Sequence, residues 1–220
     1  MDRRHLAPHL VLACAVAAGV SYVASWDLGL PPVMAMLWKG AGVSLLALYA
    51  ALRARDLDGW LICAVMAFGA LGDMLLEAAG LTVGAVAFLI GHLLAIWLYL
   101  RNRRPVLTRG QLLFAIALVP ITGALAFVLP TDRDLALAAT FYSMSLAVMA
   151  AMAWNSRFPH VMVGAGALMF VVSDLLIFAR AGPLEHATQI GLAIWGLYFL
   201  GQTMISLGVT RTLAKNPLDS

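Results

Sequence analysis

Runs of about twenty consecutive apolar residues recur along the whole chain and constrain its fold more than any other feature. An α-helix rises about 1.5 Å per residue, so about twenty residues cross the ~30 Å hydrocarbon layer of a bilayer. Charged residues make up 11% of the 220, whereas an ordinary soluble domain has about 25%. The sequence therefore predicts an all-α, polytopic membrane protein.

Eight such apolar segments are separated by short breaks that contain turn-forming or charged residues. The predicted spans are 6–25, 33–52, 59–78, 82–100, 111–129, 133–155, 159–179 and 187–210. The break after the third span is so short that the third and fourth helices must form an antiparallel hairpin. Because no linker or low-complexity tract interrupts the chain, we expect one eight-helix transmembrane domain over residues 1–220.

Basic residues are distributed unevenly between the breaks, which predicts the topology. With the N-terminus placed inside, eleven lie on the inner side and only Arg133 and Arg180 on the outer side. Basic residues favour the cytoplasmic side, so both termini are predicted to be cytoplasmic. Arg3 and Arg4 before the first span resemble the start of a signal peptide, but no cleavage site precedes a soluble domain, so we expect this span to be retained.

The same distribution identifies the surroundings of the chain. The net charge of +3 is that of cytoplasmic loops near anionic lipid. No interleaving of basic and aromatic residues is present, so no nucleic-acid partner is expected. We expect a multi-pass protein of the bacterial inner membrane, and the sequence carries no signal that fixes an oligomeric state.

Three ionisable residues, Lys39, Asp73 and Asp174, lie inside the apolar spans. A charge at the centre of a membrane helix costs roughly 2.5–3.5 kcal/mol on insertion scales. Counting residues from the ends of the spans places all three ~7.5–9 Å below the outer surface. We therefore expect these groups to face one another or a wet cavity, which marks a candidate functional site.

Further polar residues are expected near this layer or somewhat deeper. They are His92 in the fourth span, Tyr142 in the sixth, and Tyr198 and Gln202 in the eighth. Small residues such as Gly40 and Gly72 let neighbouring helices approach closely. The polar side chains are therefore expected to point at other helices rather than at lipid.

Each of these residues also has a purely structural interpretation. Lys39 could extend to the outer headgroups, and the two aspartates could serve only as its structural partners. His92 could be a hydrogen-bonded packing residue. Glu77, one helical turn beyond Asp73, is expected to be a solvated helix end.

The residues together resemble the lysoplasmalogenase (YhhN-like) family. The resemblance rests on Lys39-Gly40, Gly72-Asp73-Met74-Leu75-Leu76, the segment from Phe88 to His92, and Ser173-Asp174-Leu175-Leu176. It extends from the second span to the stretch from Tyr198 to Gln202. The chain departs from the family pattern at Gly40, where proline is usual, and at Ala95 and Trp97, where a tyrosine is expected after the histidine.

This resemblance implies hydrolysis of the vinyl ether bond of lysoplasmalogens to a long-chain aldehyde and glycerophospho-ethanolamine or -choline. Asp73 and Asp174 would be the catalytic pair, one as acid and one as stabilising carboxylate, a division of roles that glycosidases also use. Lys39 would keep one carboxyl ionised or contact the substrate phosphate.

The remaining candidates would assist this chemistry. His92, Tyr142, Tyr198 and Gln202 would orient water and the glycerol hydroxyl. The implied partners are a lysophospholipid-type substrate and the lipid bilayer. No metal or organic cofactor is implied, because the other histidines lie at helix ends or in loops and cannot join His92 in one zinc shell.

Two other classes of function could use the same residues. A proton-coupled transporter or lipid flippase would use buried Asp and Lys side chains as relays. Against this alternative, the polar groups occupy the outer half of the spans and form no path from side to side. A passive membrane or partner-binding protein would tolerate neutralisation of either aspartate.

Overall fold

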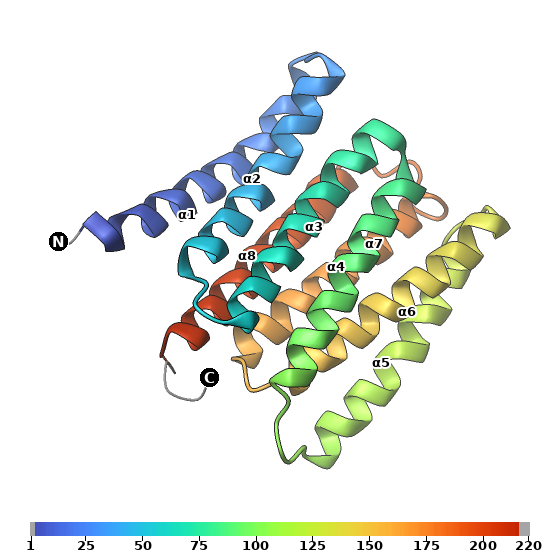
Figure 1. Ribbon diagram of the computed structural model, residues 1–220. Helices are drawn as coiled ribbons and strands as arrows, with labels where there is room; N and C mark the ends of the chain where they lie inside the picture. The colour runs from blue at the N-terminus through green and yellow to red at the C-terminus, as the bar shows by residue number, and fades with distance from the viewer. Residues whose placement is uncertain (1–2, 216–220) are drawn as a thin grey trace. The chain divides into compact units, whose positions relative to one another are not determined.

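The computed structural model describes residues 3–215, and within this range the chain folds into eight long α-helices and two short helical segments without a β-sheet (Figure 1). The elements are α1 (Arg3–Ser21), η1 (Tyr22–Asp27), α2 (Pro32–Arg53), α3 (Leu57–Ala79), α4 (Leu81–Arg101), α5 (Arg109–Val128), α6 (Arg133–Asn155), η2 (His160–Gly164), α7 (Ala165–Arg180) and α8 (Ile190–Lys215). Arg3 and Arg4, on which the predicted topology partly depends, have side chains outside the described part.

The helices coincide with the predicted spans. Within the described residues, eight helical segments are long and apolar enough to cross a membrane. The short helix η1 continues the first span, and η2 begins the seventh. The largest difference is at α8, which continues to Lys215 where the prediction ended at residue 210. Arginine, leucine, alanine and lysine are good helix formers, so the helix continues beyond its apolar part. The predicted all-α, eight-span class is confirmed.

Large apolar side chains are exposed along the helices, as lipid contact requires. Leu113, Ile116, Phe141 and Val161 are each at least 60% exposed. In water so much exposed apolar surface would be unfavourable. In a bilayer these side chains contact lipid chains, and the backbone polar groups are satisfied within each helix. The chain is an integral, multi-pass membrane protein.

The described chain divides into two compact units. The first comprises the residues up to Leu98 together with α8 from Ser206 onward, and the second comprises Tyr99–Ile205. Each unit is described by itself below. The single domain over residues 1–220 therefore stays a prediction.

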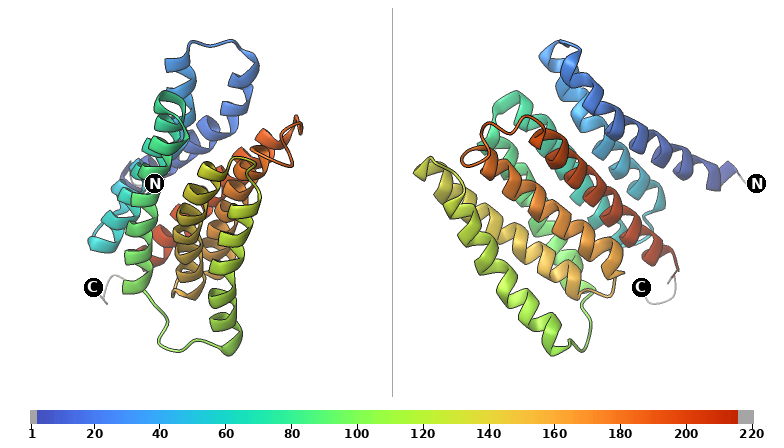
Figure 2. Two further views of the ribbon diagram at one scale, coloured as in Figure 1. Left: turned by 90° about the vertical axis from the view of Figure 1, so that its right-hand side faces the viewer. Right: turned by 180° about the vertical axis from the view of Figure 1, so that it is seen from behind.

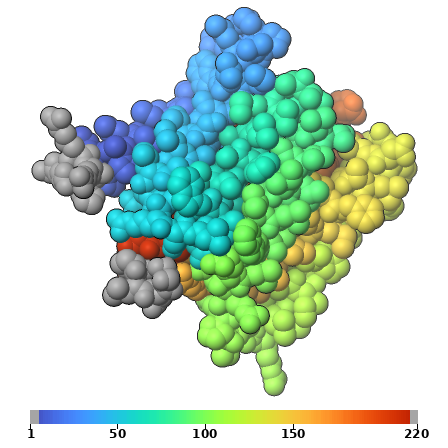
Figure 3. All heavy atoms as spheres, viewed as in Figure 1, coloured from blue at the N-terminus to red at the C-terminus, as the bar shows by residue number. Residues whose placement is uncertain are grey.

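In the first unit, α1 packs along α2 and α2 packs along α3. Gly80 closes the predicted α3–α4 hairpin with a φ of +87°, which glycine adopts without a Cβ penalty. A Cβ added at Gly72 would lie 2.7 Å from the ring of Phe88, so the glycine is what lets α4 approach α3. The space-filling view shows side chains of α2, α3 and α4 packed along one another (Figure 3).

In the second unit, α5 packs along α6 and α6 packs along α7, as the views in Figure 2 show. The backbones of α7 and α8 meet at two glycines. A Cβ added at Gly166 would lie 2.7 Å from the carbonyl oxygen of Gly201, and one added at Gly201 would lie 2.6 Å from that of Gly166. Because the contact is backbone to backbone, no side-chain movement can relieve it.

We expect Gly166→Ala to lower the free energy of unfolding by ~1–3 kcal/mol, because the added methyl group overpacks this contact. Gly196→Ala is the matched control, since a Cβ there has no heavy atom within 4 Å. Thermal unfolding in detergent measures both variants. Equal unfolding midpoints for the two variants would contradict the close α7–α8 approach.

Candidate functional site

The seven candidate residues divide between the two units. Lys39, Asp73 and His92 belong to the first unit, and Tyr142, Asp174, Tyr198 and Gln202 belong to the second. Both aspartates are buried, Asp73 with 2% and Asp174 with 6% of its surface exposed. His92, Tyr198 and Gln202 are buried as well, whereas Lys39 and Tyr142 are partly buried.

Asp73 is held on α3 between two close helix approaches. The ring of Phe88 on α4 packs against Gly72, the residue immediately before Asp73. Met74, immediately after it, packs over Gly40 of α2, where an added Cβ would lie 2.6 Å from Met74 Cγ. His92 is one turn along α4 from Phe88, so it lies on the same face of the helix, toward α3. The small residues of the sequence motif thus bring α2, α3 and α4 together around this aspartate.

Lys39 forms an ion pair that the sequence did not predict. Its Nζ donates to Oε1 of Glu77 at 2.6 Å, with the Lys39 side chain 15% exposed and that of Glu77 40% exposed. Glu77 is therefore not simply the solvated helix end that was expected. It lies two residues from the end of α3, where an ionised carboxylate costs less than one at the depth of Asp73. The long lysine side chain reaches it from α2.

Tyr22 of η1 also belongs to this group, although the sequence analysis did not select it. It is buried and close enough to Lys39, Glu77 and Asp73 to interact electrostatically with all three. Trp38 Nε1, next to Lys39, donates to Ser21 Oγ at 3.1 Å and ties α1 to α2 at this level. The one signal in the sequence was position, because Tyr22 lies near the C-terminal end of the first predicted span.

In the second unit, Tyr142 of α6 donates its hydroxyl proton to Oδ2 of Asp174 on α7 at 2.7 Å. The Tyr142 ring meets Phe178 edge to face, with ring centroids 6.4 Å apart. Phe178 in turn packs with Ala126 and Ala139 in an apolar cluster from three helices. A buried carboxyl therefore has a phenol donor held in place by apolar packing.

Two contacts next to Asp174 join α7 to α8. Ser173 Oγ donates to the backbone oxygen of Ile194 at 2.9 Å. The ring of Phe170, one turn before Asp174, meets Tyr198 edge to face at 5.1 Å. Gln202 follows Tyr198 by one turn and shares its face of α8. Tyr142 thus lies on α6 and Tyr198 and Gln202 on α8, the two helices that contact α7 near Asp174.

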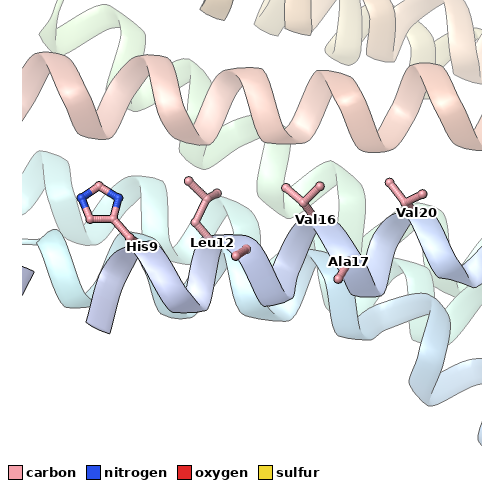
Figure 4. A pocket seen from close by; sticks show the side chains of 6 residues that line it. His9, Leu12, Val16, Ala17 and Val20 are labelled. Atoms are coloured by element: carbon pink, nitrogen blue, oxygen red, sulfur yellow. The ribbon is translucent and has the colours of Figure 1, made fainter. Parts of the chain in front are cut away.

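An apolar groove of about 590 Å³ runs along α1. Its lining residues are His9, Leu12, Ala13, Val16, Ala17 and Val20. The labelled His9, Leu12, Val16 and Val20 side chains project from one side of the helix (Figure 4). Within the described residues, no group of three or more His, Cys, Asp or Glu side chains could hold a metal ion.

The Tyr142–Asp174 hydrogen bond predicts an energetic coupling. In a double-mutant cycle of Tyr142→Phe and Asp174→Asn, we expect the two losses of unfolding free energy to be non-additive by about 1 kcal/mol or more. Urea or thermal unfolding in detergent measures the three variants. Additive losses would show that the bond does not form in the folded protein.

The Lys39–Glu77 pair predicts the result of a charge swap. Lys39→Glu places a carboxylate beside Glu77 within an apolar span, so the yield of folded protein should fall. Adding Glu77→Lys should recover at least half of the lost yield of folded protein, because the opposite charges face each other again.

Size-exclusion chromatography of the solubilised protein measures the folded yield of both variants. Lys215→Glu, at the exposed end of α8, makes the same chemical change away from the pair and should be tolerated. A swap that yields no more folded protein than Lys39→Glu would contradict the pairing.

Comparison with known proteins now places the chain. The model of the YhhN family matches residues 34–209. The lysoplasmalogenase TMEM86B of Sus scrofa is 35% identical over 194 residues, which cover 82% of this chain and 79% of the pig protein. No solved structure matches. With the matched region running from α2 through most of α8, the chain belongs to the YhhN family.

Proposed function

We propose that this protein is an ether hydrolase that cleaves the vinyl ether bond of lysoplasmalogens. The observation that carries the proposal is the extended likeness to the Sus scrofa protein named lysoplasmalogenase. The chemistry of the described residues supports it, because two carboxyl groups are buried in spans that otherwise carry few polar groups. Intramembrane ionisable groups mark functional sites.

The reaction itself needs a proton donor and a stabilising anion. A proton is added to the alkene carbon farther from the ether oxygen, and an oxocarbenium-like cation develops on the carbon bearing that oxygen. Water adds to this carbon, and the resulting hemiacetal collapses to an aldehyde and a free glycerol hydroxyl. One carboxyl group can supply the proton while a second, ionised, stabilises the cation.

Asp73 and Asp174 share these two roles in the proposal. Their surroundings differ, which supports a division of labour. Asp174 accepts a hydrogen bond from Tyr142, whereas Asp73 lies near the Lys39–Glu77 ion pair and Tyr22. His92, Tyr198 and Gln202 orient water and the glycerol hydroxyl.

The residues of the first unit support a placement for the substrate. Lys39 releases Glu77 and contacts the lipid phosphate instead. Asp73 precedes Glu77 by one helical turn, about 6 Å along α3. The glycerol backbone separates the phosphate from the vinyl ether by a comparable length. The alkyl chain lies between helices, and the groove on α1 ends at Val20, close to Tyr22. We place the protein in the bacterial inner membrane, and the arginine distribution supports cytoplasmic termini.

The test is aldehyde release from a lysoplasmenylethanolamine by the purified protein in detergent. We expect activity in the parent and losses of about a hundredfold or more in Asp73→Asn and in Asp174→Asn, the range for general acid–base groups. Asp134→Asn, at an exposed position in the first turn of α6, is the control and should keep parental activity.

Folded yield is measured alongside, so that a loss of activity is not mistaken for misfolding. A folded parent without activity would overturn the hydrolase proposal and favour the transport alternative. Activity that survives in both folded aspartate variants would leave the enzyme but remove the aspartate pair from its mechanism.

A further inference from the structure

Two loops of the second unit are joined by a short antiparallel bridge. One follows α4 and the other follows α6, and Arg103 pairs with Ser156 across them. The backbone N–H of Arg157 donates to Asn102 at 2.8 Å, and that of Arg104 donates to Asn155 at 3.3 Å. Arginine side chains from both loops are thereby held at one place in the fold.

Two of these arginines are held by hydrogen bonds from their Nε atoms. Arg104 Nε donates to the backbone oxygen of Ser156 at 2.7 Å, and Arg157 Nε donates to Oδ1 of Asn102 at 2.6 Å. Asn102 and Ser156 are buried, so they form a rigid base. Each guanidinium keeps two terminal nitrogens in a planar array, a geometry that matches the oxygens of a phosphate.

The two loops carry basic residues without acidic neighbours in the sequence. Arg109 follows the bridge at the start of α5, and no aspartate or glutamate occurs in residues 99–113 or 153–161. The acidic residues Asp132 and Asp134 lie at the other end of α6, ~33 Å away along the helix. Like charges held close together repel, and an anion bound between them removes that cost.

The position of the cluster indicates which class of anion it would bind. The bridge lies where α4 ends, α5 begins, α6 ends and η2 begins, so it is at the boundary of four membrane spans. Lipid phosphates lie at this boundary, and basic pockets between spans on the cytoplasmic side bind anionic headgroups. The arginine distribution of the sequence places this end of the spans on the cytoplasmic side.

We propose that Arg103, Arg104 and Arg157 form a binding site for the headgroup phosphate of an anionic phospholipid of the adjacent leaflet. The site is independent of the proposed hydrolysis, because Asp174 is toward the other end of the same unit, near the end of α7. The lipid joins the two loops and so holds the ends of α4 and α6 together.

The test uses the full-length protein in nanodiscs of phosphatidylcholine with a minor fraction of phosphatidylglycerol. Native mass spectrometry measures retained phosphatidylglycerol. We expect Arg104→Gln and Arg157→Gln to weaken its binding about fivefold each, the factor for ~1 kcal/mol per basic residue at an anionic surface. Arg103→Gln should have a similar effect, and it removes no side-chain bond of the bridge, so it tests binding if the other variants fail to fold.

The matched control is Arg211→Gln combined with Lys215→Gln, which removes two charges from the end of α8 and should leave binding unchanged. An equal loss in this control would reduce the effect to general surface charge and overturn the site. Unchanged binding in a folded Arg103→Gln variant would also overturn it. Displacement of the lipid by millimolar inorganic phosphate would assign the cluster to a soluble anion instead.

Discussion

The hydrocarbon interior offers no water, and the rest of the structure follows from this constraint. Each backbone polar group must be bonded within its own helix, which makes helices the form of every span. A polar side chain must find a partner on a neighbouring helix, as Tyr142 finds Asp174 and Lys39 finds Glu77. Neighbouring helices must also approach closely, and the facing glycines Gly166 and Gly201 allow their backbones to touch. Packing and polar pairing thus support each other around both aspartates.

Sequence alone was sufficient for the spans, because the cost of placing a residue in lipid depends mainly on its own chemistry. The eight segments, the α3–α4 hairpin at Gly80 and the burial of both aspartates were predictable in this way. Pairing was not predictable to the same degree. Which side chain Lys39 contacts depends on how α2 and α3 rotate about their axes and on the reach of four methylene groups. From the sequence, the two aspartates were therefore the expected partners of Lys39, Glu77 was expected to be a solvated helix end, and Tyr22 was not a candidate.

The two aspartates have different surroundings, and this difference is what makes a catalytic pair chemically reasonable. Asp174 has a neutral phenol donor fixed by Phe178 and the apolar cluster behind it. Asp73 is close to a charged pair and to a second tyrosine, Tyr22. Acid and stabilising roles require two carboxyl groups whose environments favour different protonation states. The likeness to the Sus scrofa lysoplasmalogenase adds the reaction for which such a pair would be suited.

The most direct test of the account is whether Asp73 and Asp174 act as one unit in catalysis. The measurement is kcat/KM for aldehyde release by Asp73→Asn, Asp174→Asn and the double variant, each purified as folded protein. Residues that act together are strongly non-additive, so the double variant should be no slower than the slower single variant within a few-fold. Losses that multiply in the double variant would show that the two carboxyl groups act independently and would contradict the catalytic pair.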